Sequence, residues 1–224
     1  MPLSWSGVNA GSRGQERVTM DLREDGVPPA PATLVAAVQH IEQAEGLDRP
    51  AAALERLASA VVRPGVVHDA LVGSWLGHAL HPLMTDLPIG FWTSASVLDL
   101  VGGAAGRPAA DRLLGVGIAS ALPTAATGLA EWLHADRRAR RIGLVHANAN
   151  SVGLALYTAS WLARRRGRRA AGVALALAGA TAATLGGYLG GHLATARKVG
   201  TRAPQFPEPR LIDTRLDEPR PLEP

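Results

Sequence analysis

Cysteine is missing from this chain, and several other residue types are scarce. The 224 residues include no cysteine, two phenylalanines and two tyrosines, and Lys198 is the single lysine. Without cysteine the chain has no disulfide, no thiolate zinc site and no iron–sulfur cluster of its own. Any metal ligands must therefore be histidine, carboxylate or amide groups. The first thirty residues also lack an apolar run like that of a signal peptide, so internal segments must direct the chain to the membrane.

The basic residues are almost all arginine, and the formal net charge is +4. They stand mainly in short clusters beside apolar stretches, which is the pattern of loops between membrane helices. A protein that binds a nucleic-acid groove spreads its basic residues along one helix face, with aromatic residues between them. The sequence therefore predicts a lipid bilayer as a partner and no nucleic acid.

Four apolar stretches indicate the fold class. They cover residues 82–102, where Asp86 and Asp99 are the only charges, then 113–130, 142–163 and 170–196, which have none. Each stretch reaches or nears the ~20 residues that a helix needs to cross ~30 Å of hydrocarbon. Short connections force neighbouring helices to be antiparallel. The sequence predicts an all-α, integral membrane, up-down four-helix bundle over residues 81–196.

The segments around this bundle differ in character. Residues 33–80 have apolar positions at near-helical spacing, interrupted near Gly46 and Pro50, and predict short amphipathic or interfacial helices. These helices could lie on the membrane surface, cap the bundle or form a soluble hairpin. Residues 66–80 read as an interfacial helix that leads to the bilayer. Residues 1–32 and the Pro-rich tail 197–224 are expected to be disordered.

Proline and glycine within the apolar stretches carry further expectations. Pro88 and Pro123 should kink their helices and free carbonyl oxygens that neighbouring helices must satisfy. The last stretch has small residues at four-residue spacing, including Gly186 and Gly190. Small residues let helix backbones approach closely in lipid.

The up-down topology brings one set of polar side chains to a single membrane face. The first and third helices begin at that face, and the second and fourth end there. The residues there are His78, His81, Asp86, Glu131, His134, His146 and His192. Each such group costs on the order of 2–3 kcal/mol in the apolar core, and a shared site would offset that cost. His81, His146, His192 and His78 are the candidate cofactor ligands. Asp86, Glu131 and His134 are alternative metal ligands.

Two cofactors suit these side chains, and a third interpretation needs neither. Imidazoles on facing helices can bind a haem b iron axially. Histidine together with Asp86 or Glu131 could instead hold a divalent metal, as in carboxylate-bridged bundles. The other interpretation is that headgroups and water satisfy residues so near helix ends, which then serve packing alone. His81 and His146 are favoured as ligands, because a proline fixes the backbone after His81 and His146 lies about 7 Å inside its helix.

Several motifs resemble a known family of bacterial membrane domains. They are residues 73–90 (GSWLGHALHPLMTDLPIG), 98–103 (LDLVGG), 146–148 (HAN) and 186–193 (GGYLGGHL). Together they resemble domain of unknown function 2231, a four-helix family, over about residues 35–200. The resemblance implies a membrane redox setting, because relatives often carry a Rieske iron–sulfur domain after the fourth helix or are encoded near redox proteins. The family's histidine motifs correspond to His78, His81, His146 and His192. Many relatives have a proline where this chain has Ala79, and this chain has no Rieske domain.

Three functional hypotheses follow. The first is a redox-associated subunit of the bacterial inner membrane that binds haem or a metal and exchanges electrons with a separate Rieske-type or other redox protein. The second is a structural or accessory membrane protein without a cofactor. A solute or proton pathway is the least supported, because polar groups at one face give no continuous route. No nucleophile–base pair is visible, so enzymatic activity stays undecided. The orientation also stays open, with seven basic residues at each face, although Arg63 and the missing export signal favour cytoplasmic termini.

Overall fold

The computed structural model describes residues 32–200, and every regular element among them is a helix. The elements are α1 (Ala32–Gln43), the 3-10 helix η1 (Glu45–Leu47), α2 (Asp48–Val61), α3 (Val66–Val72), α4 (Leu80–Val101), α5 (Gly103–Trp132), α6 (Arg137–Arg165) and α7 (Arg169–Thr195). The predicted all-helical class is therefore confirmed. The expected disorder of the two ends concerns mainly residues 1–31 and 201–224, which lie outside the described residues.

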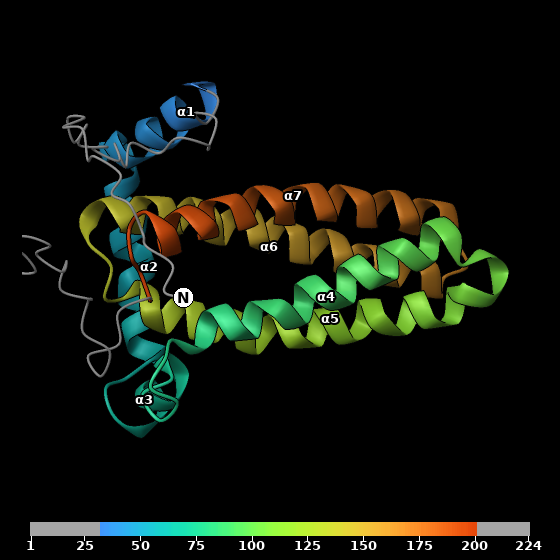
Figure 1. The fold of residues 1–224 in the computed structure, drawn as a ribbon, viewed down its shortest axis with the longest axis horizontal. Helices are drawn as coiled ribbons and strands as arrows, with labels where there is room; N and C mark the ends of the chain where they lie inside the picture. The colour runs from blue at the N-terminus through green and yellow to red at the C-terminus, as the bar shows by residue number, and fades with distance from the viewer. Residues whose placement is uncertain (1–31, 201–224) are drawn as a thin grey trace, which may run out of the picture.

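The four long helices, α4 to α7, lie lengthwise beside one another (Figure 1). Helix α4 packs along α5 and α6 packs along α7, and these two pairs meet less extensively through α5 with α6 and α4 with α7. Helices α4 and α6 thus stand diagonally across the bundle. Consecutive long helices run in opposite directions, as the short connections require.

Tight turns at one end of the bundle allow these short connections. Gly103 has a φ of +54° between α4 and α5, and Gly167 has a φ of +74° between α6 and α7. Residues other than glycine rarely adopt these backbone angles. Glycine therefore permits each chain reversal within a few residues. At the opposite end, Asp136 caps α6 by accepting a hydrogen bond of 2.9 Å from the Ala139 amide.

Helices α1 to α3 gather at the end of the bundle that lies opposite these turns, and we call it the capped end (Figure 1). Helices α1 and α2 both pack against α6, and α3 packs against α5 and α4. These helices therefore cap one end of the bundle. The interfacial helix expected over residues 66–80 is shorter, since α3 ends at Val72 and α4 begins only at Leu80.

Two apolar clusters form the interior of the described part. The cluster at the capped end joins α1 and α2 to the long helices and consists of Val38, Ala51, Trp132, Ala135, Ala139, Ile142, Leu144, Leu189 and Leu193. The second cluster lies between the long helices and consists of Trp92, Ala95, Leu114, Tyr157 and Ala176. Helices α1 and α2 are therefore part of the packed structure.

Many large apolar side chains of the long helices point outward. The exposed ones are Leu83, Leu87, Ile89, Val97, Leu100 and Val101 of α4, Val116 and Leu122 of α5, Val152 and Leu162 of α6, and Leu177, Leu185 and Tyr188 of α7. By length and composition, two helices, α5 and α7, are apolar enough to cross a membrane. Helix α4 carries two aspartates, and the middle of α6 carries His146, Asn148 and Asn150, and these polar residues lower the hydropathy of both helices.

Candidate histidine site

His81 is held by a neighbouring helix. It lies in the first turn of α4, and its Nδ1 atom is 3.0 Å from the carbonyl oxygen of Thr124 and 3.2 Å from the hydroxyl of Thr127, both on α5. A carbonyl oxygen can only accept, so Nδ1 carries the ring proton. The Nε2 atom of His81 therefore keeps its lone pair, which is the form of imidazole that binds a metal.

His146 is held in the same way by the other helix pair. Its Nδ1 atom, on α6, donates to the Gly186 carbonyl of α7 at 2.7 Å. The Nε2 atom therefore carries the lone pair, and the amide nitrogen of Asn150 lies 3.1 Å from it. Asn150 is four residues further along α6 and so shares the face of His146. The same amide nitrogen is 3.3 Å from Nδ1 of His146, so it contacts the ring between its two nitrogens.

The two imidazoles meet between the diagonal helices α4 and α6. Their ring centres are 6.4 Å apart and their planes are nearly perpendicular, at 86°. The structure therefore brings two imidazoles from different helix pairs close together, edge toward face.

Two glycines make room for these rings. A Cβ atom at Gly128 of α5 would lie 2.6 Å from the His81 ring, and one at Gly190 of α7 would lie 2.9 Å from the His146 ring. Both distances are too short for real side chains. Each imidazole thus packs directly on the backbone of a partner helix, which glycine alone permits.

The other candidate residues lie apart from this pair. Glu131 is buried at the end of α5, where its Oε1 atom accepts a hydrogen bond of 3.3 Å from the His81 backbone amide, so it touches the main chain of His81 and not its ring. Asp86 is exposed on the outer surface of α4, and His78 is exposed before that helix begins. His134 is exposed after α5, with its ring centre 5.1 Å from that of His68 on α3.

His192 faces α1 and not the central pair. Its Nε2 atom lies 2.9 Å from Oε1 of Glu42, and Arg197 donates to both carboxylate oxygens of Glu42. The hydrogen bond from Arg197, with a smaller contribution from His192, holds the pKa of Glu42 below its usual value, against the effect of burial. No sequence motif points to Glu42, which lies 150 residues from His192 in the chain.

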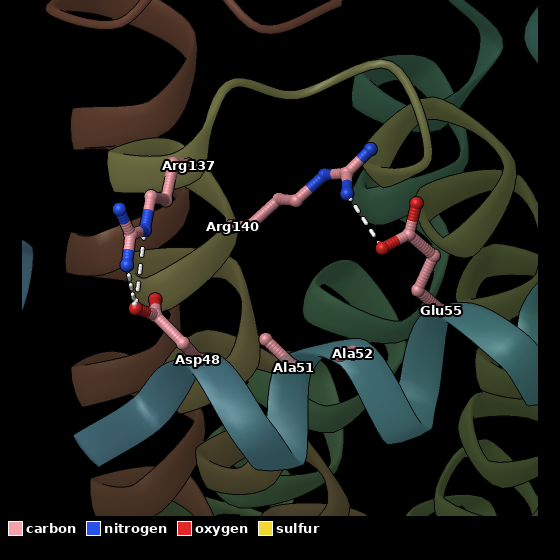
Figure 2. A pocket seen from close by; sticks show the side chains of 6 residues that line it. All are labelled: Asp48, Ala51, Ala52, Glu55, Arg137 and Arg140. Atoms are coloured by element: carbon pink, nitrogen blue, oxygen red, sulfur yellow. Dashed lines mark hydrogen bonds and ion pairs between the residues drawn. The ribbon is translucent and has the colours of Figure 1, made fainter. Parts of the chain in front are cut away.

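Further ion pairs attach α2 to the same end. Asp48 accepts hydrogen bonds from Arg141 at 2.7 and 2.8 Å and from Arg137, and Arg140 pairs with Glu55 at 2.6 Å. Figure 2 shows Asp48 turned toward Arg137 and Glu55 turned toward Arg140. Arg141 and Arg137 hold the pKa of Asp48 well below its usual range. The arginines at the start of α6, which read as loop charges in the sequence, thus hold α2 in place.

The number of possible metal ligands in one place is small. Within residues 32–200, no three or more His, Asp or Glu side chains come together as a metal-binding group. Of the seven predicted site residues, the structure brings the rings of His81 and His146 together. It also places Glu131 against the His81 backbone.

Comparison with known proteins agrees with the helical, apolar character of the chain. The family described as "Predicted membrane protein (DUF2231)" matches residues 77–203. No match was found among curated proteins or among solved structures. The matched region contains all four long helices together with His81 and His146. On this match over more than half of its length, the chain belongs to the DUF2231 family of predicted membrane proteins.

Proposed function

We propose that α4 to α7 cross a lipid bilayer, so that the chain passes through the membrane four times. Two of these helices meet the length and hydropathy needed for crossing. The other two also expose large apolar side chains, including Val101 of α4 at 78% and Val152 of α6 at 54%. Large apolar side chains exposed on all four long helices are unusual for a soluble protein, whereas lipid chains can cover them.

Cysteine labelling tests the four crossings directly, because the chain contains no cysteine. Ser59 and Ala196 are exposed at the capped end, and Ala104 and Ala170 are exposed near the tight turns. Single cysteines at the first two positions should react with a membrane-impermeant maleimide from one side. Cysteines at the last two should react from the other side. Labelling of all four positions from one side would contradict the proposal.

Within this bundle, His81 and His146 are the residues that would hold a haem iron. The observation that carries the proposal is that each Nδ1 atom donates to a backbone carbonyl, at 3.0 and 2.7 Å, while the rings lie 6.4 Å apart. Metal-binding histidines usually donate their second nitrogen to such an acceptor, which fixes both the tautomer and the ring.

The number of protein ligands favours haem over a metal ion alone. Zinc sites use three or four protein ligands, whereas a porphyrin supplies four nitrogens and leaves two axial positions for the protein. A haem held by both histidines would bridge the α4–α5 and α6–α7 pairs, since His81 belongs to one pair and His146 to the other. A bound haem would supply one-electron chemistry, and a separate redox protein, of Rieske or other type, would be the electron partner.

A pyridine haemochrome assay on purified protein tests this proposal. Haem should be present in the unchanged protein and lost in both His81→Ala and His146→Ala. His40→Ala is the matched control, because His40 is exposed on α1 away from the pair. A colourless, metal-free protein with its full helical content would refute haem binding.

A second candidate function is that of a structural or accessory membrane protein. The observation in its favour is that the same two hydrogen bonds link α4 to α5 and α6 to α7. Asparagine keeps an N–H donor but is a poor axial ligand. A double His81→Asn, His146→Asn variant that keeps both stability and physiological activity would therefore favour the structural role. Lost activity with kept stability would favour the cofactor.

A further inference from the structure

The end of the bundle with the tight turns is rich in arginine. It carries Arg107, Arg112, Arg164, Arg165, Arg166, Arg168 and Arg169, against the two carboxylates Asp99 and Asp111. The structure divides these arginines into two groups, one buried in ion pairs and one turned outward.

Two arginines use up both carboxylates. Arg164 donates to Asp99 at 2.5 and 2.9 Å and to Asp111 at 3.1 Å, and Arg169 reaches the same two residues at 2.6 and 3.0 Å. The side chains of Arg164 and Asp99 are only 1% and 3% exposed. Two positive and two negative charges are therefore paired with one another at this end, Arg164 and Asp99 in the interior and Arg169 and Asp111 at its edge.

The other five arginines are exposed, and we call them the arginine face: Arg107, Arg112, Arg165, Arg166 and Arg168. None of them forms an ion pair within residues 32–200. Three stand on one rigid turn, because the amides of Arg166 and Arg168 both donate to the Ala163 carbonyl and Gly167 takes the left-handed angle between them. The backbone that carries these three arginines is therefore ordered before a ligand binds.

The capped end is different, although it is also rich in arginine. There Arg137 and Arg141 pair with Asp48, Arg140 pairs with Glu55, and Arg197 pairs with Glu42. Helices α1 and α2 supply all three of these carboxylates. The arginine face receives no such carboxylates from the described part of the chain, so its positive charge is left for another partner.

The surroundings of the arginine face show what kind of partner this is. Leu100 and Val101 at the end of α4 are 70% and 78% exposed, and Leu162 of α6 is 40% exposed. The guanidinium of Arg165 lies 4.9 Å from the ring centre of Trp161, and tryptophan favours the membrane–water interface. Positive charge thus borders directly on an apolar surface. A ligand that suits both has an anionic head and acyl chains.

We propose that the arginine face binds the phosphate groups of anionic phospholipids. Guanidinium groups form paired hydrogen bonds with phosphate oxygens, and basic residues beside a membrane helix attract anionic headgroups. The inference rests on the proposed membrane insertion. Release of the protein from membranes by alkaline carbonate would refute insertion, whereas an inserted protein without lipid preference would refute only the headgroup site.

Native mass spectrometry of the full chain, extracted with equal amounts of phosphatidylglycerol and phosphatidylcholine, tests the site. The unchanged protein should retain phosphatidylglycerol preferentially. The triple variant R165Q/R166Q/R168Q should bind phosphatidylglycerol about a hundredfold more weakly, from the usual contribution of each arginine near a charged surface. The matched control R49Q/R56Q/R63Q removes three exposed arginines near the capped end and should keep the preference.

Three results would overturn the proposal. They are an unchanged lipid preference in the arginine-face variant, an equal loss in the control, and displacement of phosphatidylglycerol by inorganic phosphate. If the triple variant does not fold, R107Q/R112Q carries the same test on α5. Its phosphatidylglycerol binding should fall by more than tenfold, and unchanged binding would again overturn the site.

Discussion

The hydroxyl of Thr124 on α5 donates a hydrogen bond of 3.0 Å to the carbonyl oxygen of Met84 on α4. Met84 stands four residues before Pro88, which has no N–H, so this carbonyl lacks its helical donor. Helix α4 continues through Pro88, and α5 continues through Pro123. The expectation that a neighbouring helix satisfies a carbonyl freed by proline is confirmed for Pro88. Thr124 shares its proton with the Ser120 carbonyl at 2.8 Å.

Replacing Thr124 by valine should destabilise the bundle. The change removes the donor and leaves the Met84 carbonyl unsatisfied in an apolar setting, which costs about 1–3 kcal/mol. Thermal unfolding in detergent measures the loss of stability. Thr124→Ser keeps the hydroxyl donor and should retain most of the stability of the unchanged protein. Thr184→Val is the control, because Thr184 is exposed and bonds only within its own helix. Equal losses at both positions would show that the link between helices contributes nothing.

Alanine at Gly128 or Gly190 should disturb the histidine pair. A methyl group at either position collides with an imidazole, which must turn and leave its carbonyl acceptor, and such overpacking costs about 1–3 kcal/mol. Unfolding measurements and haem content report on the change. Gly187→Ala and Gly191→Ala test helix propensity alone, since nothing lies within 4 Å of a Cβ there. These controls should be neutral or stabilising by up to about 1 kcal/mol.

Loss of Asp99 should be the most damaging single change at the end with the tight turns. Asp99→Ala leaves the buried Arg164 with Asp111 alone, and breaking a buried ion pair costs about 3 kcal/mol. Chemical unfolding of the detergent-solubilised protein measures it. Asp86→Ala, on the exposed side of the same helix, should change stability little. The double variant Asp99→Leu, Arg164→Met should lose less than Asp99→Ala, because it leaves no unpaired charge at Arg164.

The attachment of α1 should weaken in acid. The folded pKa of Glu42 is lowered from its usual 4.5, so its ion pair with Arg197 contributes fully above pH 4.5 and is lost as the pH falls through the folded value. Hydrogen exchange of α1 amides, corrected for intrinsic rates, should show falling protection below pH 4.5. Glu42→Gln should give low protection at every pH. A variant that still lost protection in acid would assign the effect to another carboxyl group.

The sequence by itself determined the helical class and the order of the long helices. Apolar runs near the length of a membrane span, and glycines at 103 and 167 where the chain reverses, are local properties of the chain. The antiparallel order of the apolar stretches places His81 and His146 at one end of the bundle, and the structure brings their rings together. Their role as cofactor ligands stays a prediction.

Only the tertiary structure decided which polar side chains meet. The seven polar residues expected at one membrane face do not all contact one another, since His192 binds Glu42 and Asp86 is exposed. Arg164 and Asp99, 65 residues apart, form a buried pair that no motif indicates. The physical reason is that apolar patterning tells where a helix runs, but only weakly how far it is rotated about its axis. Packing against other helices fixes that rotation, and the rotation determines which residue each inward side chain contacts.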